Sequence, residues 1–297
     1  MENPRASAAS VDLRAVRYLT YLMFFMFAMT TDSVGLIIQQ VIAEFGLSLK
    51  KAGALHYGSM AGIAGAGLFL GFLADRIGRK RSILLGLALF GTASCVVPLT
   101  HTFAAVLVLI TLSGVAIGLF KSAALALVAD ISSSTNELTS TMNMVEGFFG
   151  IGSIVGPAVL SLLLERGVSW RWLYAFAGAL CLLLIVIAAK ARYPADAQTI
   201  GAPRNMRSTV RLLTNPYALG FSAAAFAYVA VECAIYVWMP TLLADYHGRW
   251  QALAVAALPT FFVLRALGRF IGAWLLRHFD WTRAIAICSG AILHPTT

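Results

Sequence analysis

The sequence predicts an all-α, polytopic membrane protein, and three observations carry that prediction. Hydrophobic residues make up 60% of the 297 positions and charged residues only 12%, and the mean hydropathy is +0.82, which lies far outside the range of soluble proteins. Eight segments are long and apolar enough to cross a bilayer as helices, since a crossing needs about 20 mostly apolar residues. Arginines and lysines concentrate in alternate loops between these segments.

The expected spans follow one another with short connections and one long interruption. They are residues 16–42, 52–73, 82–99, 103–129, 142–164, 172–189, 216–242 and 252–276. A ninth apolar segment begins near Arg283 and reaches only half a span before His294 and Pro295. The polar interruption predicts four parts: a tail at 1–15, a six-helix bundle at 16–189, a linker at 190–215 and a partial second bundle at 216–297.

The basic residues determine the expected orientation. Arg14 and Arg17 precede the first span, Arg76 to Arg81 follow the second, and five more basic residues lie between 190 and 211. Positive residues favour the cytoplasmic side, so we expect the N-terminus and the linker to be cytoplasmic. The formal net charge of +9 is therefore a topology signal and no indication of a nucleic-acid partner.

The loop between the second and third spans carries the most specific motif of the chain. It reads Gly71-Phe72-Leu73-Ala74-Asp75-Arg76-Ile77-Gly78-Arg79-Lys80-Arg81. Glycines allow close helix approach and a tight turn, and Asp75 can accept hydrogen bonds from the arginines. A loop that only set the orientation would not need these glycines. The expected gating residues are Gly71, Asp75, Arg76, Gly78, Arg79 and Lys80.

This motif resembles the loop signature of the major facilitator superfamily. The resemblance implies twelve helices in two six-helix bundles, of which this chain supplies eight or nine, with a complete first bundle. It also implies that the loop ties the two halves together when the inner side is closed. We therefore expect a chain that is truncated at its C-terminal end, with polar faces around Glu232 and Arg265 exposed to lipid.

Ionisable side chains within the expected spans mark a candidate cavity, because a charge at membrane depth costs at least about 2.5 kcal/mol by insertion scales. Four of them, in the first, fourth, fifth and seventh spans, have polar neighbours at helical spacing on the same face. The expected substrate and coupling residues are Asp32, Gln39, Lys121, Asn143, Glu146, Tyr228, Glu232 and Tyr236.

Several segments are similar to the fucose permease branch of the superfamily, which consists of sugar-proton symporters. They are Asp32 with Gln39 and Gln40, the stretch 118–124, and Gly150 with Gly156, Pro157 and 169–172. The resemblance implies that Asp32 contributes to sugar binding or proton coupling. Lys121 departs from the pattern, which has a glutamate at that position. This cation fits an anionic solute, or a pair with Asp32 that opens on substrate binding.

The predicted function is secondary transport of a small polar solute, a sugar or an organic anion, coupled to protons by alternating access across a bacterial-type inner membrane. One alternative is a drug or metabolite exporter, because Gly152, Gly156 and Pro157 also resemble a fifth-helix motif of drug-proton antiporters. Such small residues also serve close helix contacts. A further alternative is an inactive remnant or a membrane scaffold.

The remaining chemistry of the sequence argues against an enzyme. Cys95, Cys181, Cys233 and Cys288 lie in apolar stretches with no metal spacing. The five histidines lie singly near span ends, and no catalytic motif accompanies them. We expect no catalytic residue, metal or cofactor, and as partners only a solute, protons and the lipid bilayer.

Overall fold

The computed structural model describes residues 13–194, 214–244 and 246–293, and all regular structure in these ranges is helical. The first half contains α1 (Leu13–Thr31), α2 (Val34–Phe45), α3 (Leu49–Ala52), α4 (Ala54–Leu70), α5 (Leu73–Ile77), α6 (Arg79–Val96), the 3₁₀ turn η1 (Val97–Leu99), α7 (Phe103–Asp130), α8 (Thr135–Glu165) and α9 (Arg171–Lys190). The second half contains α11 (Pro216–Leu243), α12 (Gln251–His278) and α13 (Trp281–Leu293).

The helices correspond closely to the expected spans. Within the described ranges, seven helical segments are long and apolar enough to cross a membrane, with α1 and α2 counted as one segment. The second expected span is the shorter α4, which has 17 residues and is continued beyond Gly71 by α5. Of the expected linker at 190–215, residues 195–213 lie outside the described residues.

Local sequence signals set the helix ends. The hydroxyl of Thr102 accepts a hydrogen bond from the amide of Ala105 at the start of α7, and Ser134 does the same for Glu137 at the start of α8. Asn215 caps α11, whose first residue is Pro216. Gly46 ends α2 with a φ of 61°, a conformation that other residues rarely adopt.

Glycines bring the helices of the first bundle into direct backbone contact. A Cβ atom on Gly114 of α7 would overlap the carbonyl of Ser59 in α4. Cβ atoms on Gly152 and Gly156 of α8 would overlap the carbonyls of Phe25 and Met29 in α1. These two glycines therefore serve the α1–α8 contact.

A cluster of aromatic residues fills the centre of the first bundle. The ring of Phe27 in α1 lies 4.7 Å from that of Phe90 in α6 and 4.6 Å from that of Phe120 in α7, measured between centroids. All three side chains are fully buried. These contacts hold α1 against α6 and α7.

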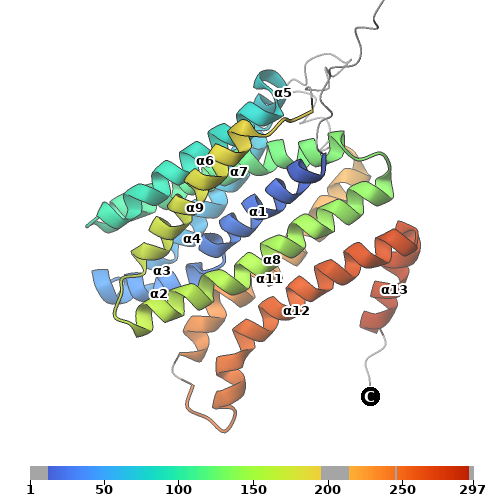
Figure 1. Ribbon diagram of the computed structural model, residues 1–297. Coiled ribbons are helices and arrows are strands. Elements are labelled where there is room, and N and C mark those ends of the chain that lie inside the picture. Colours follow the sequence, from blue (N-terminus) through green and yellow to red (C-terminus); the bar gives the residue numbers. More distant parts are fainter. Residues whose placement is uncertain (1–12, 195–213, 245, 294–297) are drawn as a thin grey trace, which may run out of the picture.

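Two helix pairs join the halves, as Figure 1 shows for α8 and α12, which run side by side. In that pair, Gly147 and Gly150 of α8 lie against Phe270 and Ala266 of α12. In the other pair, Gly35 of α2 lies against the backbone of α11 at Tyr236. The start of α1, α5 and the end of α9 lie at one end of the molecule (Figure 1).

Candidate functional site

The first membrane segment is broken at Asp32. Residues Asp32 and Ser33 form a turn between α1 and α2, and no glycine or proline lies at the turn. Hydroxyl groups supply hydrogen bonds to the carbonyls next to the break: Thr30 and Thr31 donate to Phe27, and Ser33 donates to Met29 at 2.6 Å. The break thus places a carboxylate next to backbone carbonyls that already accept hydrogen bonds from side-chain hydroxyls.

Asp32 belongs to a buried charge network that joins the two halves. Nη1 of Arg265, in α12, lies 2.6 Å from Oδ2 of Asp32, and Nε of the same guanidinium forms an ion pair with Glu232 of α11. Ser153 of α8 donates to Asp32. One guanidinium therefore contacts two carboxylates from separate helices, so that each carboxylate has a cationic partner at membrane depth.

The network is enclosed by protein. Asp32 is 4% exposed and Glu232 is 9% exposed, and the side chain of Arg265 is 10% exposed. The expectation that Glu232 and Arg265 face lipid is therefore wrong. The reason is that α12 lies along α8, and Gly150 allows the two backbones to approach closely enough to cover the guanidinium.

Two tyrosines of α11 extend the polar surface around Glu232. The hydroxyl of Tyr228 donates to Oε1 of Glu232 at 3.4 Å and accepts from Nη2 of Arg269 at 3.2 Å. Tyr236 is buried, and its hydroxyl lies 3.2 Å from Sγ of Cys233. Of the expected stripe, Glu232 and Tyr236 are therefore buried against the first half, whereas Tyr228 is half-exposed and contacts Arg269 of α12.

Lys121 lies on aromatic rings. Its Nζ is 4.5 Å from the centroid of the Phe149 ring and 5.6 Å from that of Phe24, and it forms no ion pair with a described carboxylate. Of the two roles expected for Lys121, the pair with Asp32 is replaced by the pair with Arg265. Cζ of Arg265 also lies over the Phe149 ring, at 5.4 Å. Two cations therefore share one aromatic ring.

The other expected cavity residues occupy separate positions. Asn143 donates to the carbonyl of Thr139 in its own helix at 3.0 Å, and its side chain faces Gly272 of α12. Glu146 is half-buried and forms no ion pair with a described residue. Its carboxylate interacts with Arg265 only through longer-range electrostatic attraction. Gln39 lies in the middle of α2, outside the charge network, where it lines a cavity.

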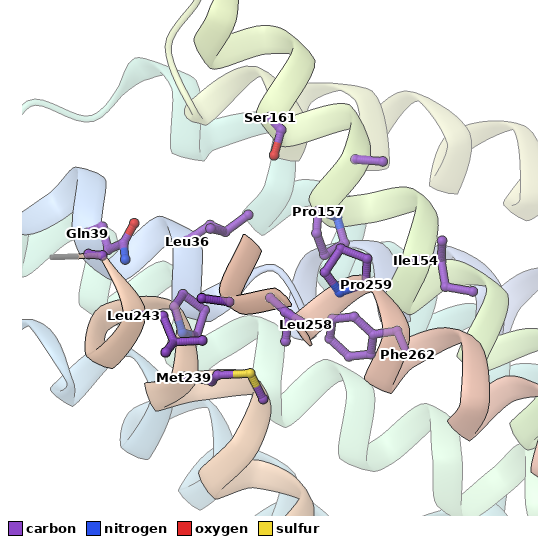
Figure 2. Close-up of a pocket in the computed structure, with 14 residues that line it drawn as sticks. Leu36, Gln39, Ile154, Pro157, Ser161, Met239, Leu243, Leu258, Pro259 and Phe262 are labelled. Carbon is purple, nitrogen blue, oxygen red and sulfur yellow. The ribbon is translucent and has the colours of Figure 1, made fainter. Parts of the chain in front are cut away.

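That cavity lies between α2, α8, α11 and α12 and has a volume of about 350 Å³ (Figure 2). Its walls are mostly apolar, and Gln39 and Ser161 supply side-chain polar groups. Pro157, Pro240 and Pro259 line it, each within a different helix. A proline inside a helix removes one backbone hydrogen bond, so three helices are weakened around one space.

The charged loop makes its described contacts within the first half. Nη1 of Arg79 lies 2.6 Å from Oδ1 of Asp75, and its Nε lies 3.0 Å from Oδ2 of Asp130 at the end of α7. Lys80 donates to the carbonyls of Ala189 and Ala191 at the end of α9.

Two glycines and Arg76 complete this loop. Gly78 has a φ of 93°, which fits its place in the turn before α6, and Gly71 follows the last residue of α4. Arg76 lies over the ring of Phe72, 5.5 Å from its centroid. The six residues that the sequence predicts to gate therefore lie together at one end of the first bundle.

Three residues of the site, Ser153, Phe149 and Arg265, are not among those predicted from the sequence. Arg265 carried a signal, since it is an ionisable residue in an apolar span. Ser153 and Phe149 resemble ordinary helix residues in sequence. Within the described part of the chain, no group of three or more His, Cys, Asp and Glu side chains is arranged to hold a metal ion.

Comparisons with known proteins agree with this architecture. The family model of the Major Facilitator Superfamily matches residues 20–295. Among curated proteins, a TsgA homolog of Buchnera aphidicola subsp. Baizongia pistaciae is 19% identical over 93% of this chain and 70% of its own length. Protein TsgA of Escherichia coli O157:H7 is 22% identical over 92% of this chain and 69% of its own length.

Solved structures share the fold. A crystal structure of the E. coli fucose:proton symporter FucP superimposes with a TM-score of 0.72 at 19% identity, over 91% of this chain and 73% of FucP. FucP in the outward conformation superimposes with a TM-score of 0.66 at 17% identity, over 89% of this chain and 72% of FucP. At these identities the likeness establishes the arrangement of helices.

Proposed function

The chain belongs to the major facilitator superfamily of membrane transporters, and from this premise we propose that it is a secondary active transporter of a small polar solute, coupled to protons. The solute is a sugar or an organic anion. As a multi-pass protein with bacterial relatives, it would act in the inner membrane with its N-terminus in the cytoplasm.

The single observation that supports this proposal best is the network of Asp32, Arg265 and Glu232. Its charges come from both halves, so movement of one half against the other must separate or exchange them. A carboxylate released from Arg265 gains in proton affinity, because burial favours its neutral form. A proton or an anionic solute can then replace the lost partner, which is the coupling that a secondary transporter needs.

The position of Lys121 supports an organic anion as one of the two proposed classes of solute. It is a half-buried cation without an ionic partner among the described residues, and it shares the Phe149 ring with Arg265. A carboxylate group bound between these two cations would be neutralised. The aromatic ring would contact the apolar part of such a solute.

Proton movement in proteoliposomes tests the proposal. The purified chain is reconstituted with a pH-sensitive dye inside, and fucose and lactate are added in turn as a neutral sugar and a small anion. We expect one of them to drive a saturable pH change, and Asp32→Asn to abolish it. Glu44→Gln, at an exposed carboxylate that pairs with Arg171 outside the charge network, is the control that retains the response. An unchanged pH response in Asp32→Asn would contradict the proposed coupling role of this carboxylate.

The apolar cavity favours a second candidate, export of an amphiphilic compound. Its volume of about 350 Å³ and its apolar walls suit a drug-sized molecule. The close contacts of Gly152 and Gly156 do not favour this candidate, since the α1–α8 interface accounts for both glycines. Increased sensitivity to lipophilic cations after deletion of the gene, with no effect on sugar uptake, would favour export.

A further inference from the structure

A second, much smaller cavity lies inside the first bundle. Its volume is about 20 Å³, which is enough for one water molecule. The polar residues that line it are Thr30, Thr31, His56, Ser59, Ser113 and Tyr174. The cavity is bounded by α1, α2, α4, α6, α7 and α9 and is separate from the larger space next to Gln39.

Two polar atoms of this cavity lack partners. Nδ1 of His56 and Oγ of Ser113 form no hydrogen bond with any described residue. His56 is 6% exposed and Ser113 is 4% exposed, so bulk water does not supply the missing bonds. Buried polar groups are nearly always hydrogen-bonded, and a pair of unbonded groups around a water-sized space indicates a bound water.

We propose that this cavity binds one ordered water molecule that bridges Nδ1 of His56 and Oγ of Ser113. The hydroxyls of Thr30 and Thr31 already donate to the carbonyl of Phe27, so their oxygens retain lone pairs that can accept from the water. With these partners the water has the two to four hydrogen bonds that a buried water typically makes.

Nuclear magnetic resonance of the protein in lipid bilayers tests the water site. It needs no solute and no transport, so its outcome is independent of the proposed function. The protein is labelled with ¹⁵N-histidine, and the His56 signals are assigned by their loss in His56→Gln.

In the wild-type chain we expect magnetisation transfer between water and Nδ1 of His56. Ser113→Val fills the cavity and should abolish this transfer. Ser94→Ala is the matched control, because Ser94 is also a buried serine with an unbonded hydroxyl but does not line the cavity. Transfer that is absent from the wild type, or that persists in Ser113→Val, overturns the water site.

Discussion

Arg265 and Asp32 are 233 positions apart in the sequence, and their side chains form a direct ion pair in which Nη1 lies 2.6 Å from Oδ2. This pair connects the broken first span to α12 in the second half. Both side chains are largely buried, so removal of either one leaves the other charge without this ionic partner.

The pair should show strong coupling in a double-mutant cycle. Removing one partner of a buried ion pair costs roughly 3 to 5 kcal/mol, because the other charge remains buried and unpaired. We expect Asp32→Asn and Arg265→Gln each to lower the unfolding temperature in detergent. The double variant should lose less than the sum of the single losses. Strictly additive losses would contradict the pair. The pair of Glu44 and Arg171, in which the Glu44 side chain is 38% exposed, provides a control cycle with weaker coupling.

Lys121→Met should reduce solute binding without lowering stability. Lys121 has no carboxylate partner among the described residues, so its removal leaves no orphan charge and ends the cost of burying an ammonium group. Thermal unfolding should be unchanged or raised, while binding of a small organic anion, measured by calorimetry, should fall at least about tenfold. Lys50→Met, at an exposed position in α3, is the control. Normal anion affinity in Lys121→Met would remove Lys121 from the site.

Gly156→Ala should destabilise the bundle. The added methyl group would overlap the carbonyl of Met29 and push α8 away from α1, at a cost of roughly 1 to 3 kcal/mol. Gly268→Ala in α12 is the matched control, because a methyl group there meets open space and a helix favours alanine. Unfolding temperatures of the two variants in detergent should therefore move in opposite directions. Equal effects would contradict the close α1–α8 contact.

The proposed orientation predicts opposite labelling of two positions. In a cysteine-free background, Ser208→Cys in the expected linker should react only after the cells are permeabilised, because the linker is expected to be cytoplasmic. Arg249→Cys, in the exposed loop before α12, should react with an impermeant reagent in intact cells. Labelling of Ser208→Cys from outside would reverse the orientation.

The spans were predictable because apolar length and helix caps are local properties. The segment expected at 103–129 is α7, Phe103–Asp130, and the one expected at 216–242 is α11, Pro216–Leu243. The break at Asp32 was not predictable, since no glycine or proline marks it and hydroxyl groups on Thr30, Thr31 and Ser33 bond to the carbonyls there. Turns with such side-chain hydrogen bonds have weak sequence signals.

The partner of Asp32 was the main error in the candidate site. Lys121 and Arg265 are both cations in apolar spans, and the sequence contains no signal that ranks them. The choice depends on how α12 lies against α8, which Gly147 and Gly150 permit by close contact with Phe270 and Ala266. Packing between helices of different halves is a tertiary property, and periodicity in a single sequence does not report it.

The turn at Asp32 and Ser33 divides the first membrane segment into two helices, which pack on different halves of the protein. Before the turn, α1 is held against α8 by Gly152 and Gly156, and after it, α2 is held against α11 by Gly35. Because side-chain hydroxyls bond to the carbonyls at this point, a change in angle between α1 and α2 does not strip those carbonyls of all their partners. We therefore expect this turn to act as a hinge, because the helices on its two sides pack on different halves and Asp32 lies between them.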